Sequence, residues 1–166
     1  MHRNKLIVAG ILYCCSFPVG AVESLCSATE AIIFSCYTGK KIVSVCASKD
    51  LSATTGYMQY RFGSKGTPEI VYPQSKEHPR NYTEAGVLTF AGGGGAYLRF
   101  KKEPYGYVVY TAIGRGWGQK AGLVVEKNNK LISNLKCNKA AATSELGPDL
   151  YEKAGLPEDQ KSFDLP

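Results

Sequence analysis

The chain has little of what membrane-spanning and nucleic-acid-binding proteins need. It contains one tryptophan, two methionines and two histidines, and no apolar run approaches the roughly 18 residues of a membrane-spanning helix. The lysines occur singly or in pairs, such as Lys40-Lys41 and Lys101-Lys102, with no dense basic run. We therefore predict neither a membrane span nor a nucleic-acid partner.

Catalytic and metal-binding patterns are also scarce. The sequence has no Gly-x-Ser-x-Gly elbow and no Cys-x-x-Cys pair, and the only histidine after residue 21, His78, precedes a proline in a polar stretch. Nothing indicates a metal or a cofactor, and we predict that the protein is not an enzyme. A hydrolase using carboxylates such as Glu69, Glu84 or Glu103 remains an alternative, but no spacing selects a pair.

The first 21 residues are typical of an export signal. A short basic start is followed by ten mostly apolar residues, and Val19-Gly20-Ala21 supplies small residues before a cleavage site. We predict cleavage after Ala21 and a periplasmic or secreted protein. An alternative is lipid modification at Cys14 or Cys15, which the large residue before each cysteine disfavours.

The remaining residues, 22–166, fit one domain, because domains commonly run to about 100–150 residues. Their 18 basic and 14 acidic residues give a net charge of +4. The charge is uneven, since six acidic residues and two lysines follow Ser144, so the body is basic and the last stretch acidic. Such a balance bears on solubility and on the choice of partners.

Four cysteines remain after the signal, and an even number in an exported protein predicts two disulfides. Of the three pairings, we favour Cys36–Cys46 as a local clip and Cys26–Cys137 as a staple between the two ends of the domain. A simple hairpin about Gly39-Lys40 would place Cys36 opposite residue 43, so the clip requires a bulge or a longer loop.

Short runs rich in β-branched and aromatic residues predict an all-β antiparallel fold, a sandwich or a small barrel. Residues 57–62 show the alternation well, with Met58, Tyr60 and Phe62 on one face. Lys127-Asn128-Asn129 suits a hairpin turn, and residues 147–154 predict a short helix before an extended tail. The expected strands are 31–37, 41–47, 57–62, 69–72, 87–90, 96–101, 105–113, 121–126 and 130–137.

Two glycine-rich runs stand out. The first, Gly92, Gly93, Gly94 and Gly95, lies between two strand-like halves and leads into Tyr97. One interpretation is structural, a loop or bulged strand that needs positive φ or close backbone packing. The other is a recognition loop, because binding residues are common on loops of a rigid β scaffold.

The second run surrounds the single tryptophan, Trp117, with glycines and with Arg115. Tryptophan is most often part of a core, yet tryptophan, tyrosine and arginine are also enriched at interface hot spots. If this run meets the tetraglycine segment, it forms a rigid basic edge together with Tyr97 and Arg99.

These features together resemble the bacterial periplasmic lysozyme inhibitors of the c-type and i-type groups. In those families a Ser-Gly-x-x-Tyr loop enters the lysozyme cleft, and its polar groups meet the catalytic carboxylates. Tyr97 and Gly94 correspond to the tyrosine and glycine of that pattern, whereas Gly93 stands at the serine position and lacks the hydroxyl.

We therefore expect an exported binding protein that blocks a secreted or periplasmic enzyme, a lysozyme-type cell-wall hydrolase or, in an immunity role, a rival toxin. A glycosidase cleft carries two carboxylates, which would attract a basic edge. The alternative is a structural or adaptor domain of the envelope.

Overall fold

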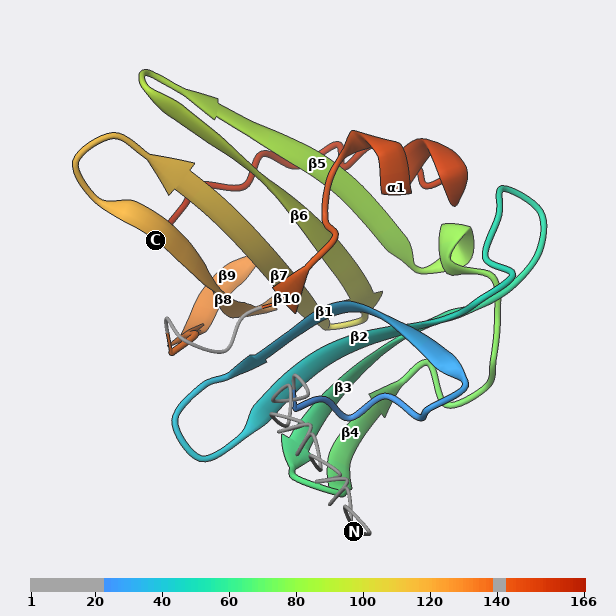
Figure 1. Ribbon diagram of the computed structural model, residues 1–166. Helices are drawn as coiled ribbons and strands as arrows, with labels where there is room; N and C mark the ends of the chain where they lie inside the picture. Colours follow the sequence, from blue (N-terminus) through green and yellow to red (C-terminus); the bar gives the residue numbers. More distant parts are fainter. Residues whose placement is uncertain (1–22, 139–142) are drawn as a thin grey trace, which may run out of the picture.

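The computed structural model describes residues 23–138 and 143–166, which form two antiparallel β-sheets packed as a sandwich (Figure 1). The first sheet has the order β10-β1-β2-β3-β4 and the second the order β5-β6-β7-β8-β9. All the predicted strands are present, so the predicted all-β antiparallel class is confirmed. The elements are β1 (Glu30–Tyr37), β2 (Ile42–Ser48), β3 (Met58–Ser64), β4 (Thr67–Tyr72), a 3-10 turn (Pro79–Asn81), β5 (Thr83–Phe90), β6 (Gly93–Lys102), β7 (Tyr105–Gly114), β8 (Gly118–Lys127), β9 (Lys130–Lys136), β10 (Thr143–Ser144) and α1 (Pro148–Lys153).

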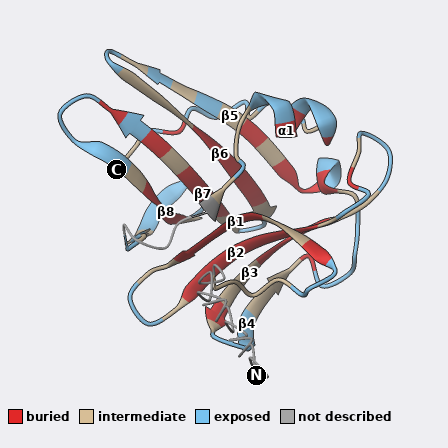
Figure 2. Cartoon of the chain, in the orientation of Figure 1, coloured by how far each residue is buried: buried red, intermediate tan, exposed pale blue. Residues whose placement is uncertain are grey.

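The core lies between the two sheets. Alternation in β3 directs Met58 and Tyr60 inward and Gln59 and Arg61 to the outer face, as the sequence predicted. The ring of Tyr60 packs 5.8 Å, between centroids, from that of Phe100 on the other sheet. Buried residues accordingly follow the middle of the strands in Figure 2.

Two hairpins form as their turn residues predict. The β1–β2 hairpin places Cys36 opposite Val43, as expected for a turn about Gly39-Lys40. Asn128 and Asn129 have φ values of 49° and 62° between β8 and β9, and a two-residue turn of this kind matches the twist of the flanking strands.

The predicted disulfide pairing is wrong. The structure joins Cys26 to Cys46 and Cys36 to Cys137, with Cα–Cα distances of 5.3 and 5.6 Å. Cys36 faces the core between the sheets, whereas Cys46 lies on the other face of the first sheet, opposite Ile32 rather than Cys36. A bond between Cys36 and Cys46 would have to pass through the sheet, so each cysteine finds a partner on its own side.

The first described residues, 23–29, cover the outer face of the first sheet. The N–H of Leu25 donates to Ser44 Oγ at 3.0 Å, and Ser35 Oγ donates to the carbonyl of Glu23 at 2.8 Å. The Cys26–Cys46 bond fixes the same segment to β2. The residues that follow the predicted cleavage site are therefore an integral part of the fold.

A buried ion pair lies at the end of this segment. Arg61 donates to both carboxylate oxygens of Glu30, at 2.7 and 2.8 Å, and to the carbonyl of Leu25. Burial alone would raise the pKa of Glu30, but hydrogen bonds from Arg61, the N–H of Ser27 and the Tyr57 hydroxyl, together with the charge of Arg61, lower it to about 2.

This ion pair predicts a loss of stability in acid. Because the folded-state pKa of Glu30 lies below the unfolded value of about 4.5, its contribution is complete above that pH and is lost as the pH falls towards 2. We expect about 2–3 kcal/mol of the free energy of unfolding to disappear over this range. Urea unfolding between pH 7 and pH 2 measures it, and Glu30→Gln is expected to flatten the dependence. Superimposable pH profiles for the two proteins would contradict the prediction.

The last part of the chain covers the outer face of the second sheet. After α1, the N–H of Ala85 donates to the carbonyl of Pro157 and the N–H of Asp159 to the carbonyl of Ala85, at 2.9 and 2.8 Å. Phe163 then packs between the rings of Tyr97 and Tyr110, with centroid distances of 5.0 and 5.7 Å. The predicted helix and extended tail are both present.

The predicted signal at residues 1–21 lies outside the described residues. In the part of the chain that the structure describes, no helix is both long enough and apolar enough to cross a membrane.

Candidate functional site

The strands of two neighbouring hairpins form a projection at one end of the second sheet, beyond the strands of the first (Figure 1). We call residues 87–95 and 111–120 the distal arm. The N–H of Arg115 donates to the carbonyl of Gly92 at 2.9 Å, and Gly93 pairs with Gly114 in the sheet. The structure thus brings the tetraglycine segment and the Arg115–Trp117 run together.

The tetraglycine segment is mostly strand rather than loop. Gly92 forms the turn with a φ of 77°, but β6 begins at Gly93. A Cβ atom added at Gly95 would collide with the Thr111 carbonyl and with Ala112 at 2.8 Å on β7. Glycine here allows the backbones of β6 and β7 to approach closely, which supports the structural interpretation for this residue.

Trp117 folds back onto its own hairpin. A Cβ atom at Gly114 would collide with the indole, so glycine is required beneath it. The ring of Phe90, from the other hairpin, lies 5.6 Å from the indole between centroids, and Lys120 Nζ lies 4.9 Å from its centroid. The two tips are therefore fastened together by an aromatic contact as well as by the hydrogen bond.

The distal arm is exposed and has a positive charge. Trp117 is 36 % exposed, Val87 56 % and Ile113 64 %. Residues 87–95 and 111–120 include Arg115 and Lys120 but no aspartate or glutamate. Figure 2 shows the ends of both hairpins as mainly exposed. The arrangement combines apolar area, a tryptophan and cations on short, closely packed strands.

Tyr97 and Arg99 do not belong to this exposed surface. Tyr97 is 4 % exposed beneath Phe163, and Arg99 is 2 % exposed. Arg99 Nε donates to Asp159 at 2.7 Å, and its Nη1 pairs with Glu126. The expectation that both side chains form the basic edge is corrected on this point, because the last stretch of the chain covers them.

His78 also has structural contacts. Its Nδ1 accepts a hydrogen bond from the N–H of Arg80 at 3.4 Å, and its Nε2 lies 3.0 Å from the carbonyl of Ser52. Within residues 23–138 and 143–166, no group of three or more His, Cys, Asp or Glu side chains is placed to hold a metal ion.

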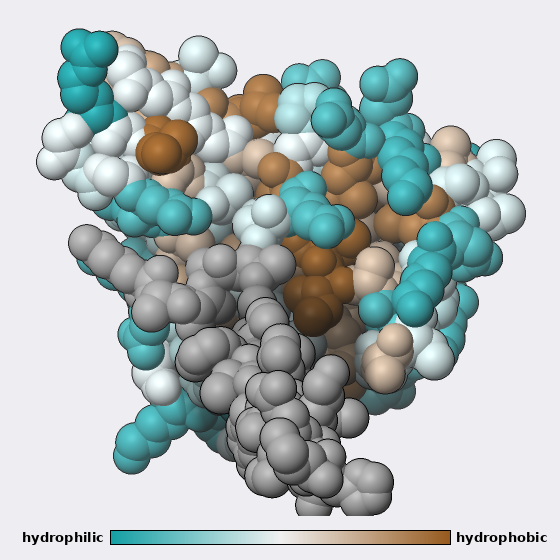
Figure 3. All heavy atoms as spheres, in the orientation of Figure 1, coloured by the Kyte–Doolittle hydropathy of each residue, from teal (hydrophilic) through white to brown (hydrophobic). Residues whose placement is uncertain are grey.

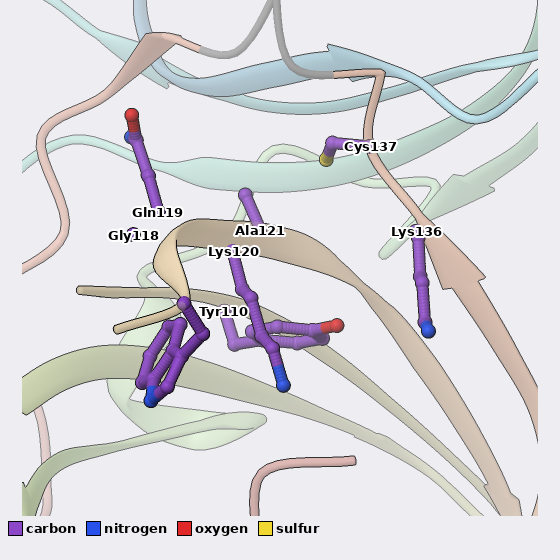
Figure 4. Close-up of a pocket in the computed structure, with 8 residues that line it drawn as sticks. Tyr110, Gly118, Gln119, Lys120, Ala121, Lys136 and Cys137 are labelled. Carbon is purple, nitrogen blue, oxygen red and sulfur yellow. The ribbon is translucent and has the colours of Figure 1, made fainter. Parts of the chain in front are cut away.

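A cleft of about 250 Å³ adjoins the base of the distal arm on its β8 side. Tyr110, Trp117, Lys120 and Lys136 line it (Figure 4). Tyr110 and Lys136 were not predicted as site residues, because they come together only through the register of β7, β8 and β9. The only available signal was the alternation within each strand, which indicates a face but not a neighbour.

Comparison with family models, curated proteins and solved structures found no match for this chain.

Proposed function

We propose that this is an exported binding protein that docks its distal arm on an acidic surface of a secreted or periplasmic enzyme and blocks that enzyme. A lysozyme-type cell-wall hydrolase or a rival toxin is the expected target. The observation that carries the proposal is the convergence of the two glycine-rich hairpin tips into one exposed aromatic and basic surface.

The composition of the arm favours a protein partner. Tryptophan and arginine are the side chains that most often dominate binding energy at interfaces. Trp117 is held by Gly114 and Phe90, so ordering it on binding costs little entropy. Arg115 is exposed and free of carboxylate partners among the described residues, so its charge is available to a partner.

The charge of the arm favours an acidic partner. The buried cation Arg99 is neutralised by Glu126 and Asp159, whereas Arg115 and Lys120 lie on a surface without acidic residues. A glycosidase cleft with two carboxylates has the complementary charge. Because Tyr97 is buried, the contact that we propose uses the hairpin tips and not the tyrosine of the Ser-Gly-x-x-Tyr pattern.

An inhibition assay tests this proposal. The protein that starts at residue 22, with both disulfides formed, is added to purified c-type, g-type and i-type lysozymes, and lysis of bacterial cell walls is measured. We expect inhibition of at least one type, and Arg115→Glu is expected to weaken it by about 10- to 100-fold at low salt. The effect of the substitution should shrink at high salt, because an exposed charge is screened.

Lys76→Glu is the matched control. Lys76 is also exposed, but it lies in the connection after β4, over the ring of Tyr57 just before β3, and is not part of the arm. Equal loss of inhibition in the two variants would contradict docking through the arm. Absence of inhibition of every lysozyme type, together with binding to insoluble peptidoglycan, would replace the proposal with an envelope adaptor role.

A further inference from the structure

The cleft beside the distal arm contains a tyrosine hydroxyl that makes no hydrogen bond to the described residues. Tyr110 is 1 % exposed and lines the cleft, but its hydroxyl makes no hydrogen bond within residues 23–138 and 143–166. Its ring lies over Gly122 on the neighbouring strand, where any Cβ atom would come within 2.8 Å of the hydroxyl oxygen. The Tyr110 side chain is therefore held in place, and its hydroxyl group is free to donate a hydrogen bond to a ligand.

Two lysines flank this hydroxyl. Gly122 is paired with Tyr110 on one side and with Lys136 on the other, and Lys120 lies two residues from Gly122 along β8. The strand alternation places all of these on the outer face of the sheet. Figure 4 shows the side chains of Lys120 and Lys136 extending to the same side, with the ring of Tyr110 overlapping Lys120 in this view and its hydroxyl pointing towards Lys136.

The polar side-chain groups on this face of the cleft, those of Tyr110, Lys120 and Lys136, can all donate hydrogen bonds. Neither lysine forms an ion pair with any described residue, and no carboxylate lines the cleft. Burial raises the pKa of Tyr110, so the hydroxyl stays protonated at neutral pH and can donate. An acceptor group that bears negative charge would satisfy all three donors at once.

The indole of Trp117 supplies the apolar wall on the face of the sheet that bears Tyr110 and the two lysines. Ala121 and Cys137 also border the cleft, but their side chains point to the core between the sheets. The volume of about 250 Å³ is suited to a group of side-chain size and not to an extended polymer. The ligand that fits is thus a carboxylate on a short apolar stem.

We propose that this cleft binds a carboxylate of the protein partner, the side chain of an aspartate or glutamate whose stem packs on Trp117. The proposal deepens the function proposed above and rests on it for the identity of the partner. A chain-terminal carboxylate has the same chemistry, and the experiment distinguishes the two sources.

The single tryptophan supplies the measurement. The indole N–H resonance of Trp117 is followed in ¹⁵N-labelled protein during titration with the blocked dipeptide acetyl-Leu-Glu-amide. We expect a saturable shift with a dissociation constant in the millimolar range, and a much smaller response to acetyl-Leu-Gln-amide. Acetyl-Leu-Ala with a free carboxyl end tests the second source, and binding tighter than that of the glutamate peptide would assign the cleft to a chain terminus and overturn the side-chain proposal.

Variants identify the donors. Lys136→Gln is expected to raise the dissociation constant about tenfold and Tyr110→Phe about fivefold, while Lys76→Gln, in the connection after β4, leaves it unchanged. The absence of saturation below about 50 mM, or an equal response to the glutamine peptide, would overturn the carboxylate site. Failure of the proposed function gives a different pattern, in which no lysozyme is inhibited although the peptide still binds.

Discussion

Replacing both Cys36 and Cys137 with alanine is expected to lower the free energy of unfolding by about 4–5 kcal/mol, the largest effect of any change considered for this chain. The bond joins residues 101 apart in sequence and links β1 of the first sheet to the end of β9 in the second. Loop-closure entropy in the unfolded chain grows with the length of the closed loop and reaches about 4.7 kcal/mol for 100 residues. Urea unfolding of the oxidised protein and of the double variant measures the difference.

The other disulfide is the matched control. Cys26 and Cys46 are 20 residues apart, so the corresponding double alanine variant is expected to lose about 3 kcal/mol. Cys36 and Cys46 are both fully buried, which makes the packing cost of the two replacements similar. An equal loss in both variants, or a larger loss for the shorter loop, would contradict the entropic argument. Peptide mapping of the oxidised protein checks the pairing itself.

The pairing illustrates which part of the structure the sequence could predict. Alternation and turn residues were enough to place the strands and to put Cys36 opposite Val43. The same register puts Cys46, three residues along β2 from Val43, on the face opposite to that of Cys36, so alternation alone argues against the predicted clip. Alternation could not show where Cys26 and Cys137 lie, because both residues are outside the strands.

The candidate site could likewise be predicted only in part. From the sequence, the two glycine-rich runs and Trp117 were interpreted as one binding edge if the runs met. The structure places the runs at adjacent tips, joined by the hydrogen bond from the Arg115 N–H to the Gly92 carbonyl. The sequence could not show that Tyr97 and Arg99 are covered, because their partners, Phe163 and Asp159, are about 60 residues away along the chain. The acidic character of the last stretch was visible, but its position on the second sheet depends on tertiary packing.

Both outer faces of the sandwich are closed in a similar manner. Residues 23–29 lie across the first sheet next to the Arg61–Glu30 pair, and residues 157–165 lie across the second next to Arg99 and Asp159. Each segment is thus fastened by an arginine on an interior strand, Arg61 on β3 and Arg99 on β6. The distal arm extends beyond these covered regions, and its hairpin tips are exposed.

Replacing Arg99 with methionine is expected to lower the free energy of unfolding by about 3–5 kcal/mol. The guanidinium is buried between Glu126 of β8 and Asp159 of the last stretch, and its removal would leave two carboxylates near each other without a cation. Methionine keeps the length and the apolar stem of the side chain, so the loss reports mainly the missing charge. Urea unfolding gives the total effect, and hydrogen exchange at Asp159, whose N–H bonds to the Ala85 carbonyl, shows whether residues 157–165 detach first.

Lys101→Met provides the comparison for this prediction. Lys101 also pairs with a carboxylate, that of Glu84, but its side chain is 37 % exposed and the expected loss is below about 1 kcal/mol. Adding Glu126→Gln and Asp159→Asn to the Arg99 variant is expected to restore part of the stability, because the uncompensated charges are then removed. If the free energy of unfolding of Arg99→Met lies within about 1 kcal/mol of that of the unmodified protein, the buried ion cluster does not hold the last stretch on the sheet. The covering of Tyr97 would then depend on the packing of Phe163, on the hydrogen bond from the Tyr97 hydroxyl to the Lys161 carbonyl, and on the backbone hydrogen bonds at Ala85.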